Sequence, residues 1–174
     1  MNEFDFGLLV MRIAFGLSLA YHGFNKVTGK GGLAGTAGWF ASLGMKSPAL
    51  QAKLAASTEI VGGLLFALGL FTPFAAGAML ALMLVAIATV HAKVGYFIFL
   101  PNGGWEYCAA IGFLAIGVSS TGPGSVSLDN ALELNFGWGG VLIAVGLGLV
   151  GAAGQLAIFY RPESNKKSQA DDKS

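Results

Sequence analysis

Four side chains suited to proton or redox chemistry stand out from an otherwise apolar sequence. They are two histidines and two glutamates: His22, Glu59, His91 and Glu106. An imidazole changes its charge near neutral pH and a carboxylate exchanges protons, so the set suits a proton-coupled redox site that binds a quinone-like molecule. Two imidazoles with two carboxylates also suit iron, zinc or manganese, although the Glu-x-x-His pair of di-iron bundles is missing. A third alternative is polar contact between helices, with each histidine bonded to a glutamate.

Residues beside these four are suited to orienting a bound molecule. Asn25 and Lys26 follow His22 at spacings of three and four, so the three share one face of a helix. Trp105 and Tyr107 flank Glu106 and could border a flat ring. We therefore predict a catalytic set, His22, Glu59, His91 and Glu106, and a substrate-binding set, Asn25, Lys26, Trp105 and Tyr107.

The composition places these side chains in a membrane. Of the 174 residues, 55% are hydrophobic and only 11% are charged, and the mean hydropathy is +0.69. A soluble domain carries about 25% charged residues, so an ordinary soluble enzyme is excluded. The net charge of +1, with no basic stripe, excludes a nucleic-acid binder. The single Cys108 excludes an intrachain disulfide. The expected class is an all-α integral membrane protein.

Five apolar segments approach or reach the length of about 20 residues that a membrane-spanning helix needs. They cover residues 7–27, 50–70, 73–92, 105–120 and 136–160. The first four predict a four-helix bundle core and the last predicts a fifth transmembrane helix. Residues 29–47 predict a short amphipathic helix at the lipid interface with Trp39 as an anchor, an ordinary loop being the alternative. Residues 1–160 are expected to form one transmembrane domain, and 161–174 a disordered polar tail.

The distribution of cations predicts the orientation in the membrane. With five spans, nine of the ten cations fall on one side: Lys26, Lys30, Lys46, Lys53, Lys93, Arg161, Lys166, Lys167 and Lys173. The opposite side carries acidic residues and no lysine: Glu3, Asp5, Asp129 and Glu133. Because loops rich in lysine and arginine stay in the cytoplasm, the N-terminus is expected outside and the C-terminus inside a bacterial inner membrane. The predicted site then lies in the cytoplasmic half of the bilayer.

Two further patterns predict contacts between helices. Arg12 in the first span and Asp129 after the fourth are expected to form a structural ion pair on the outer side. Small residues recur every four positions on one face of the last span: Gly140, Ala144, Gly148 and Ala152. Such a stripe allows helices to approach closely in lipid. It would serve packing within the chain or, alternatively, a homo-oligomer.

Five blocks in order resemble the DoxX family of small membrane proteins. They are Arg12, Gly16 and His22-Gly23-Phe24-Asn25-Lys26; Trp39-Phe40 with Leu43-Gly44; Glu59-Ile60-Val61-Gly62-Gly63 with Leu68-Gly69-Leu70 and Thr72-Pro73; His91 near Phe97, followed by the Glu106 block; and Gly122-Pro123-Gly124 with Ser127-Leu128-Asp129. The resemblance covers about residues 7–130, which is four of the five expected spans. The last span lies outside this core, so its role is not transferred.

The resemblance implies a function in redox chemistry at the membrane. DoxX-like proteins are generally described as membrane oxidoreductases, and distant relatives are named for the small subunit of an archaeal terminal quinol oxidase. Some members are associated with superoxide dismutase and thiol oxidants, others with quinone and catechol stress. We therefore expect a quinone-like ligand rather than a metal ion, whether or not the chain is itself an enzyme. The alternatives are a scaffold that recruits soluble redox proteins at the cytoplasmic face, or a transporter of small solutes or lipids.

Overall fold

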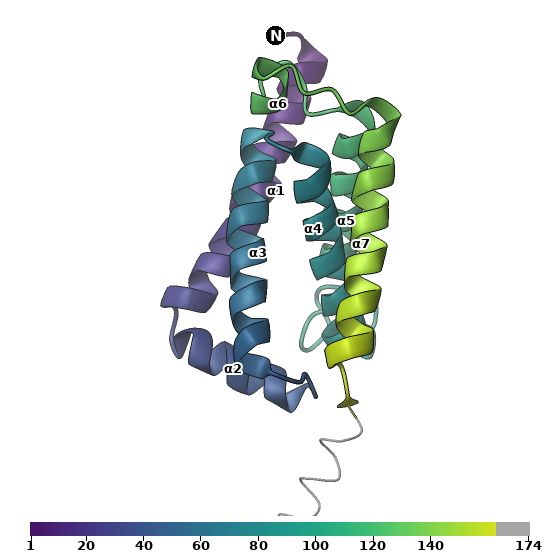
Figure 1. Cartoon of the computed structure of the whole chain (residues 1–174). Helices are drawn as coiled ribbons and strands as arrows, with labels where there is room; N and C mark the ends of the chain where they lie inside the picture. Colours follow the sequence, from purple (N-terminus) through teal and green to yellow (C-terminus); the bar gives the residue numbers. More distant parts are fainter. Residues whose placement is uncertain (163–174) are drawn as a thin grey trace, which may run out of the picture.

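A computed structural model describes residues 1–162, which form an all-α protein (Figure 1). Five long helices run side by side and two short helices lie at opposite ends of the bundle. The long helices are α1 (Glu3–Thr28), α3 (Pro48–Leu68), α4 (Thr72–Ala86), α5 (Glu106–Thr121) and α7 (Gly137–Phe159). The short helices are α2 (Gly32–Ser42) and α6 (Leu128–Ala131). One π-helical turn, η1 (Ile87–His91), continues α4.

Within residues 1–162, three helical segments are long and apolar enough to cross a membrane: Glu3–Thr28, Thr72–His91 and Gly137–Phe159. α5 is apolar but only 16 residues long. α3 has 21 residues but carries Gln51, Lys53 and Glu59 and is not among these three segments. The structure confirms an all-α membrane protein whose core bundle of α1, α3, α4 and α5 is extended by a fifth helix.

The direction of the helices alternates along the chain, so the two ends of the bundle differ. The α6 end holds the N-terminus, the α3–α4 turn and α6 (Figure 1). The α2 end holds α2, η1, the loop of residues 92–105 and Tyr160. A short antiparallel bridge between Met45 and Tyr160 ties the segment after α2 to the end of α7. The tail expected at 161–174 lies, from residue 163 onward, outside the described residues.

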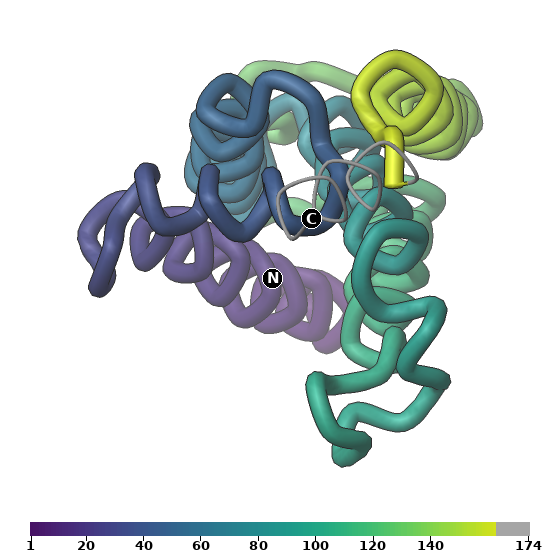
Figure 2. Tube along the Cα trace, turned by 90° about the horizontal axis from the view of Figure 1, so that it is seen from below, coloured from purple at the N-terminus to yellow at the C-terminus, as the bar shows by residue number. Residues whose placement is uncertain are grey.

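Glycine sets the spacing between the most closely packed helices. α1 packs along α3 and α4 packs along α7, while α2 crosses the end of the α1–α3 pair (Figure 2). A Cβ added to Gly16 would lie 2.6 Å from the Gly63 carbonyl oxygen, so α1 and α3 touch backbone to backbone. A Cβ on Gly148 would lie 2.5 Å from Leu80 Cδ2. The close contact of α4 with α7 therefore depends on the absence of side chains.

The small-residue stripe of α7 belongs to this contact within the chain. Gly140, Ala144, Gly148 and Ala152 are all buried, and they are covered chiefly by α4. The intramolecular alternative accounts for the stripe. The homo-oligomer alternative stays a prediction, since these four residues face the same chain.

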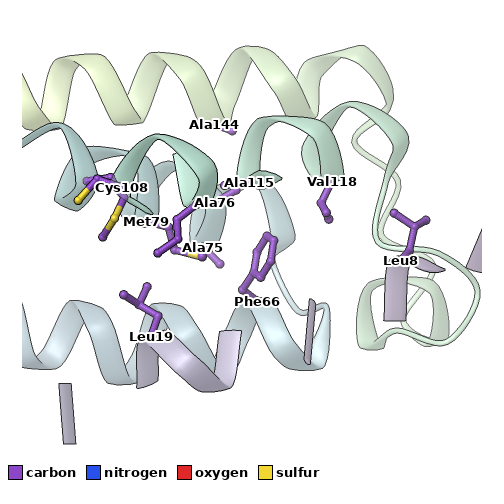
Figure 3. Packing of buried hydrophobic residues seen from close by; sticks show 12 residues of the cluster. Leu8, Leu19, Phe66, Ala75, Ala76, Met79, Cys108, Ala115, Val118 and Ala144 are labelled. Carbon is purple, nitrogen blue, oxygen red and sulfur yellow. The ribbon is translucent and has the colours of Figure 1, made fainter. Parts of the chain in front are cut away.

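The hydrophobic core lies between the two helix pairs. Leu19 and Phe66 from α1 and α3 face Met79 from α4 and Cys108 from α5 (Figure 3). Phe66 and Met79 are fully buried, with 0% of their surface exposed. Leu19 and Cys108 lie at the edge of this core and also line a cavity inside the bundle.

Candidate functional site

A cavity of about 550 Å³ opens inside the bundle. All five long helices contribute to its walls, and Trp39 and Phe40 of α2, with Leu43 just after α2, line it at one end. Most of the lining is apolar. Its polar side chains gather mainly in the half of the bundle next to α2: His22, Lys26, Thr58, Glu59, Thr89, His91, Tyr107 and Gln155. The cavity thus combines apolar walls with a few converging polar groups, the usual composition of a small-molecule site.

Lys26 and Glu59 form an ion pair in the wall of this cavity. Lys26 Nζ donates to both carboxylate oxygens of Glu59, at 2.6 and 2.5 Å. Glu59 is 6% exposed and Lys26 is half-buried. Gly23 makes the pair possible, because a Cβ there would lie 2.7 Å from both Glu59 Cβ and the Ala56 carbonyl oxygen. In the part of the chain that the structure describes, this is the one salt bridge found, and pairing reduces the cost of burying both charges.

His22 and Tyr107 lie next to this ion pair, one on each side of the α1–α5 contact. Their ring centroids are 6.3 Å apart and their planes are tilted by 46°. The Tyr107 hydroxyl shares a hydrogen bond of 3.1 Å with Ser18 Oγ, so it joins α5 to α1. Both residues line the cavity and are also exposed at the surface of the bundle. Together they place an imidazole and a phenol within reach of one bound molecule.

His91 reaches the cavity from η1. A π-helical turn shifts the register of the side chains that follow it and often occurs at functional positions. His91 Nδ1 lies 2.8 Å from the Gly103 carbonyl oxygen. Because a carbonyl only accepts, Nδ1 donates, and in the neutral ring Nε2 is then an acceptor. The loop of residues 92–105 thereby fixes the tautomer of this histidine.

Three of the predicted site residues lie outside the cavity lining. The Glu106 carboxylate accepts a hydrogen bond of 3.0 Å from the Ile98 backbone N–H and so organises the loop of residues 92–105. Trp105 packs edge-on against Tyr96, with centroids 4.6 Å apart. Asn25 is exposed on α1. The structure therefore brings together His22, Lys26, Glu59, His91 and Tyr107, and it separates Glu106, Trp105 and Asn25 from them.

The metal alternative finds no site in this geometry. Among residues 1–162, no group of three or more His, Cys, Asp or Glu side chains converges closely enough to hold a metal ion. Glu59 is paired with Lys26, and His91 is bonded to the loop backbone rather than to a carboxylate. Glu59 and His91 are thus engaged elsewhere, and Glu106 accepts from the Ile98 N–H.

At the α6 end, Arg12 and Asp129 do not form the expected direct ion pair. Asp129 accepts hydrogen bonds from the backbone N–H groups of Phe71 and Thr72, at 2.7 and 2.9 Å, and so caps α4. Arg12 donates to the Val126 carbonyl oxygen. Both side chains are almost fully buried, at 1% and 0% exposed. They bind the α3–α4 turn and the segment before α6 to α1 through backbone groups, which agrees with a structural role.

A buried amide pair was missed by the sequence reasoning. Gln155 Nε2 donates to Gln51 Oε1 at 2.8 Å and joins α7 to α3 beside the cavity. Gln51 is 0% exposed and Gln155 lines the cavity. The available signal was an isolated amide in each of two apolar segments, which membrane helices keep where it finds a partner. The aromatic residues of α2 were likewise expected at the lipid interface, and Trp39 and Phe40 line the cavity as well.

Comparison with known proteins gives three findings. The DoxX family model matches residues 7–92. A Bacillus subtilis protein named "Putative oxidoreductase CatD" is 33% identical over 131 residues, 74% of this chain and 90% of that protein. An Escherichia coli protein named "Inner membrane protein YphA" is 32% identical over 145 residues, 74% of this chain and 96% of that protein. No solved structure matches.

Proposed function

This chain belongs to the DoxX family, and we propose that it binds a quinone-like redox molecule in the cavity, in the cytoplasmic half of a bacterial inner membrane. The name of the relative CatD supports redox chemistry, and the name of YphA supports the inner membrane. The observation that carries the proposal is the cavity itself. Its apolar walls end at an ion pair, an imidazole and a phenol that converge from three helices.

The charges at the two ends of the bundle support the proposed orientation. The α2 end carries Lys26, Lys30, Lys46, Lys53, Lys93 and Arg161. The α6 end carries Glu3, Asp5, Asp129 and Glu133. Because positively charged loops remain in the cytoplasm, the α2 end faces the cytoplasm in our proposal. Protons from that side then have a short path to Glu59.

The polar residues match the needs of a quinone ring. A quinone carbonyl oxygen accepts hydrogen bonds, and Tyr107 Oη, Lys26 Nζ and a His22 ring N–H are available donors in the cavity wall. Glu59, paired with Lys26, lies in the same wall and is suited to proton exchange with a bound ring. The aliphatic side chains Leu19, Leu54 and Ile111 supply a dry surface for the ring. These roles assign ligand binding and proton exchange to the chain.

A fluorescence titration tests the proposal directly, because Trp39 lines the cavity whereas Trp138 is 81% exposed at the α6 end. A variant that keeps only Trp39 (Trp105→Phe with Trp138→Phe) is titrated in nanodiscs with a benzoquinone, which quenches indole fluorescence. We expect saturable quenching. The matched variant that keeps only Trp138 (Trp39→Phe with Trp105→Phe) should show only linear, collisional quenching. Linear quenching in both variants would contradict quinone binding in the cavity.

The same site predicts a cellular phenotype. His22→Ala or Glu59→Gln should abolish resistance to quinone or oxidant stress in cells that depend on this protein, while the amount of protein in the membrane stays the same. Glu133→Gln at the α6 end is the control, since this residue is remote from the cavity. Full resistance in the His22 and Glu59 variants would refute the proposed role of the site.

A further inference from the structure

We infer that the molecule bound in this cavity carries a hydrocarbon tail, and that the tail lies along α4 toward the α6 end. The inference rests on the proposed function and specifies its substrate class: a membrane-soluble, tailed quinone rather than a small water-soluble one. The part of the cavity that would hold the tail is here called the apolar arm. It is formed by Phe74, Gly77, Ala78, Ala81, Leu147 and Gly151.

The first support is the extent of the cavity beyond its polar end. α4 and η1 contribute lining residues from Phe74 to His91, which at the rise of an α-helix spans about 25 Å. A single quinone ring bonded to His22, Lys26 and Tyr107 occupies only the part near these residues. The remaining length has no charged side chain along it. A ligand that fills the whole cavity is therefore long, polar at one end and apolar along the rest.

The second support is the kind of residue that makes the arm hollow. Three of its four α4 residues are glycine or alanine, and Gly151 faces them from α7 at a distance where an added Cβ would lie 3.3 Å from Ala81 Cβ. A Cβ on Gly62 of α3 would still lie 3.9 Å from Ala78 Cβ. At Gly77, α4 and α7 are in close contact, since a Cβ there would lie 2.9 Å from Leu147 Cβ, whereas α3 leaves room beside Ala78. Larger residues at the same positions would fill the space.

The third support is access from lipid. Phe74 and Leu147 are each 45% exposed, and Ala78 and Ala81 are half-buried, so the arm reaches the surface of the bundle at the depth of the spanning helices. Gln51 and Gln155 tie α3 to α7 at the α2 end of this opening. A tailed molecule can therefore enter sideways from the bilayer without leaving it. A ligand that does not dissolve in the bilayer could not enter through this opening.

The tail is expected to determine position more than affinity. Moving a hydrocarbon chain from lipid into the arm yields little hydrophobic free energy, because lipid is as apolar as the arm. Its effect is to align the ring with the polar end of the cavity. The appropriate test therefore measures where the tail lies.

The test uses a decyl-ubiquinone analogue with a photoreactive diazirine at the end of its tail, bound to the full chain in nanodiscs of phosphatidylethanolamine and phosphatidylglycerol. After irradiation, mass spectrometry locates the labelled residues. We expect the label on α4 and α7 around Ala78 and Leu147. Ala78→Leu should reduce this labelling about tenfold, the factor that corresponds to about 1.4 kcal/mol. Ala153→Leu, on the exposed face of α7 and outside the cavity, should leave it unchanged.

Two controls separate this inference from the proposed function. A phosphatidylethanolamine carrying the same diazirine on an acyl chain shows the background labelling by bulk lipid, and thermal unfolding shows that Ala78→Leu is folded. If the quinone probe labels the exterior as the phospholipid does, while a tail-less benzoquinone still quenches Trp39 saturably, the inference is overturned and the proposed function stands. If neither quinone shows saturable binding, both are overturned. Labelling of the arm that Ala78→Leu removes supports the inference.

Discussion

The two ends of this bundle bury charge in opposite ways. At the α6 end, Asp129 and Arg12 are almost fully buried and are hydrogen-bonded to backbone groups of the α3–α4 turn and of the segment before α6. At the α2 end, Lys26 and Glu59 are bonded to each other and line a cavity of about 550 Å³. The charged side chains that are hydrogen-bonded to backbone groups stabilise the fold. Charge that is paired side chain to side chain beside an empty space remains available to a ligand.

A glycine allows close packing around the buried charges at each end of the bundle, but the two contacts differ. Gly69 ends α3 with a φ of 63°, and a Cβ there would overlap the Arg12 guanidinium, so this glycine is required for the arginine to be buried. Gly23 lets α3 approach α1 and brings Glu59 to Lys26. The first glycine completes a closed contact. The second positions a charged pair at the wall of the cavity.

The largest effect is expected from breaking the α6 end. Asp129→Ala removes the cap from two backbone N–H groups and leaves the buried Arg12 without a nearby carboxylate. Leaving such groups unpaired costs about 3–5 kcal/mol. Thermal unfolding in detergent should therefore show a large loss of stability. The matched change Glu133→Ala, at an exposed position of the same end, should have little effect; equal losses in both variants would contradict the assigned role of Asp129.

An intermediate effect is expected from the ion pair at the α2 end. Glu59→Gln leaves the half-buried Lys26 without its counter-charge and should lower stability by about 1–3 kcal/mol and quinone affinity by tenfold or more. Combining it with Lys26→Met should restore much of the stability, since no unpaired charge remains. The affinity should stay low. If the double variant recovered the affinity as well, the pair would be only structural.

The smallest effect is expected from the phenol of the site. Tyr107→Phe removes the hydroxyl that bonds Ser18 and faces the cavity, and a net loss of about 1 kcal/mol corresponds to roughly fivefold weaker quinone binding. Tyr21→Phe is the control, because Tyr21 is 70% exposed on α1 and does not line the cavity. Equal quinone affinities of the Tyr107 and Tyr21 variants would show that the Tyr107 hydroxyl does not take part in binding.

The sequence predicted the helices better than it predicted the site. Long apolar segments with Pro48 and Pro73 near helix starts and Gly69 at a helix end define the bundle almost by themselves. Glu106 was different: its spacing places it near the other polar residues, but a loop turns back and uses its carboxylate to bind the Ile98 N–H. The prediction of an Arg12–Asp129 ion pair was wrong for a similar reason. Backbone N–H groups compete for the carboxylate, and the sequence does not show which N–H groups will lie near it.

The cavity could not be predicted from the sequence at all. Its existence depends on how Gly23, Gly77 and Gly148 set the distances between helices, which is a property of pairs of helices rather than of segments. The pairing of Gln51 with Gln155 depends on α3 and α7 lying near each other, although they are far apart in the chain. Sequence periodicity describes one helix at a time and does not contain this information.

The central claim is that the charged pair at the α2 end serves a ligand, unlike the charges at the α6 end. The most direct measurement is the amount of quinone that remains bound per chain after purification from bacterial membranes in a mild detergent. The wild type should retain quinone in stoichiometric proportion, and the Lys26→Met, Glu59→Gln double variant, although folded, should retain almost none. Equal amounts in both, or no quinone in the wild type, would contradict this account.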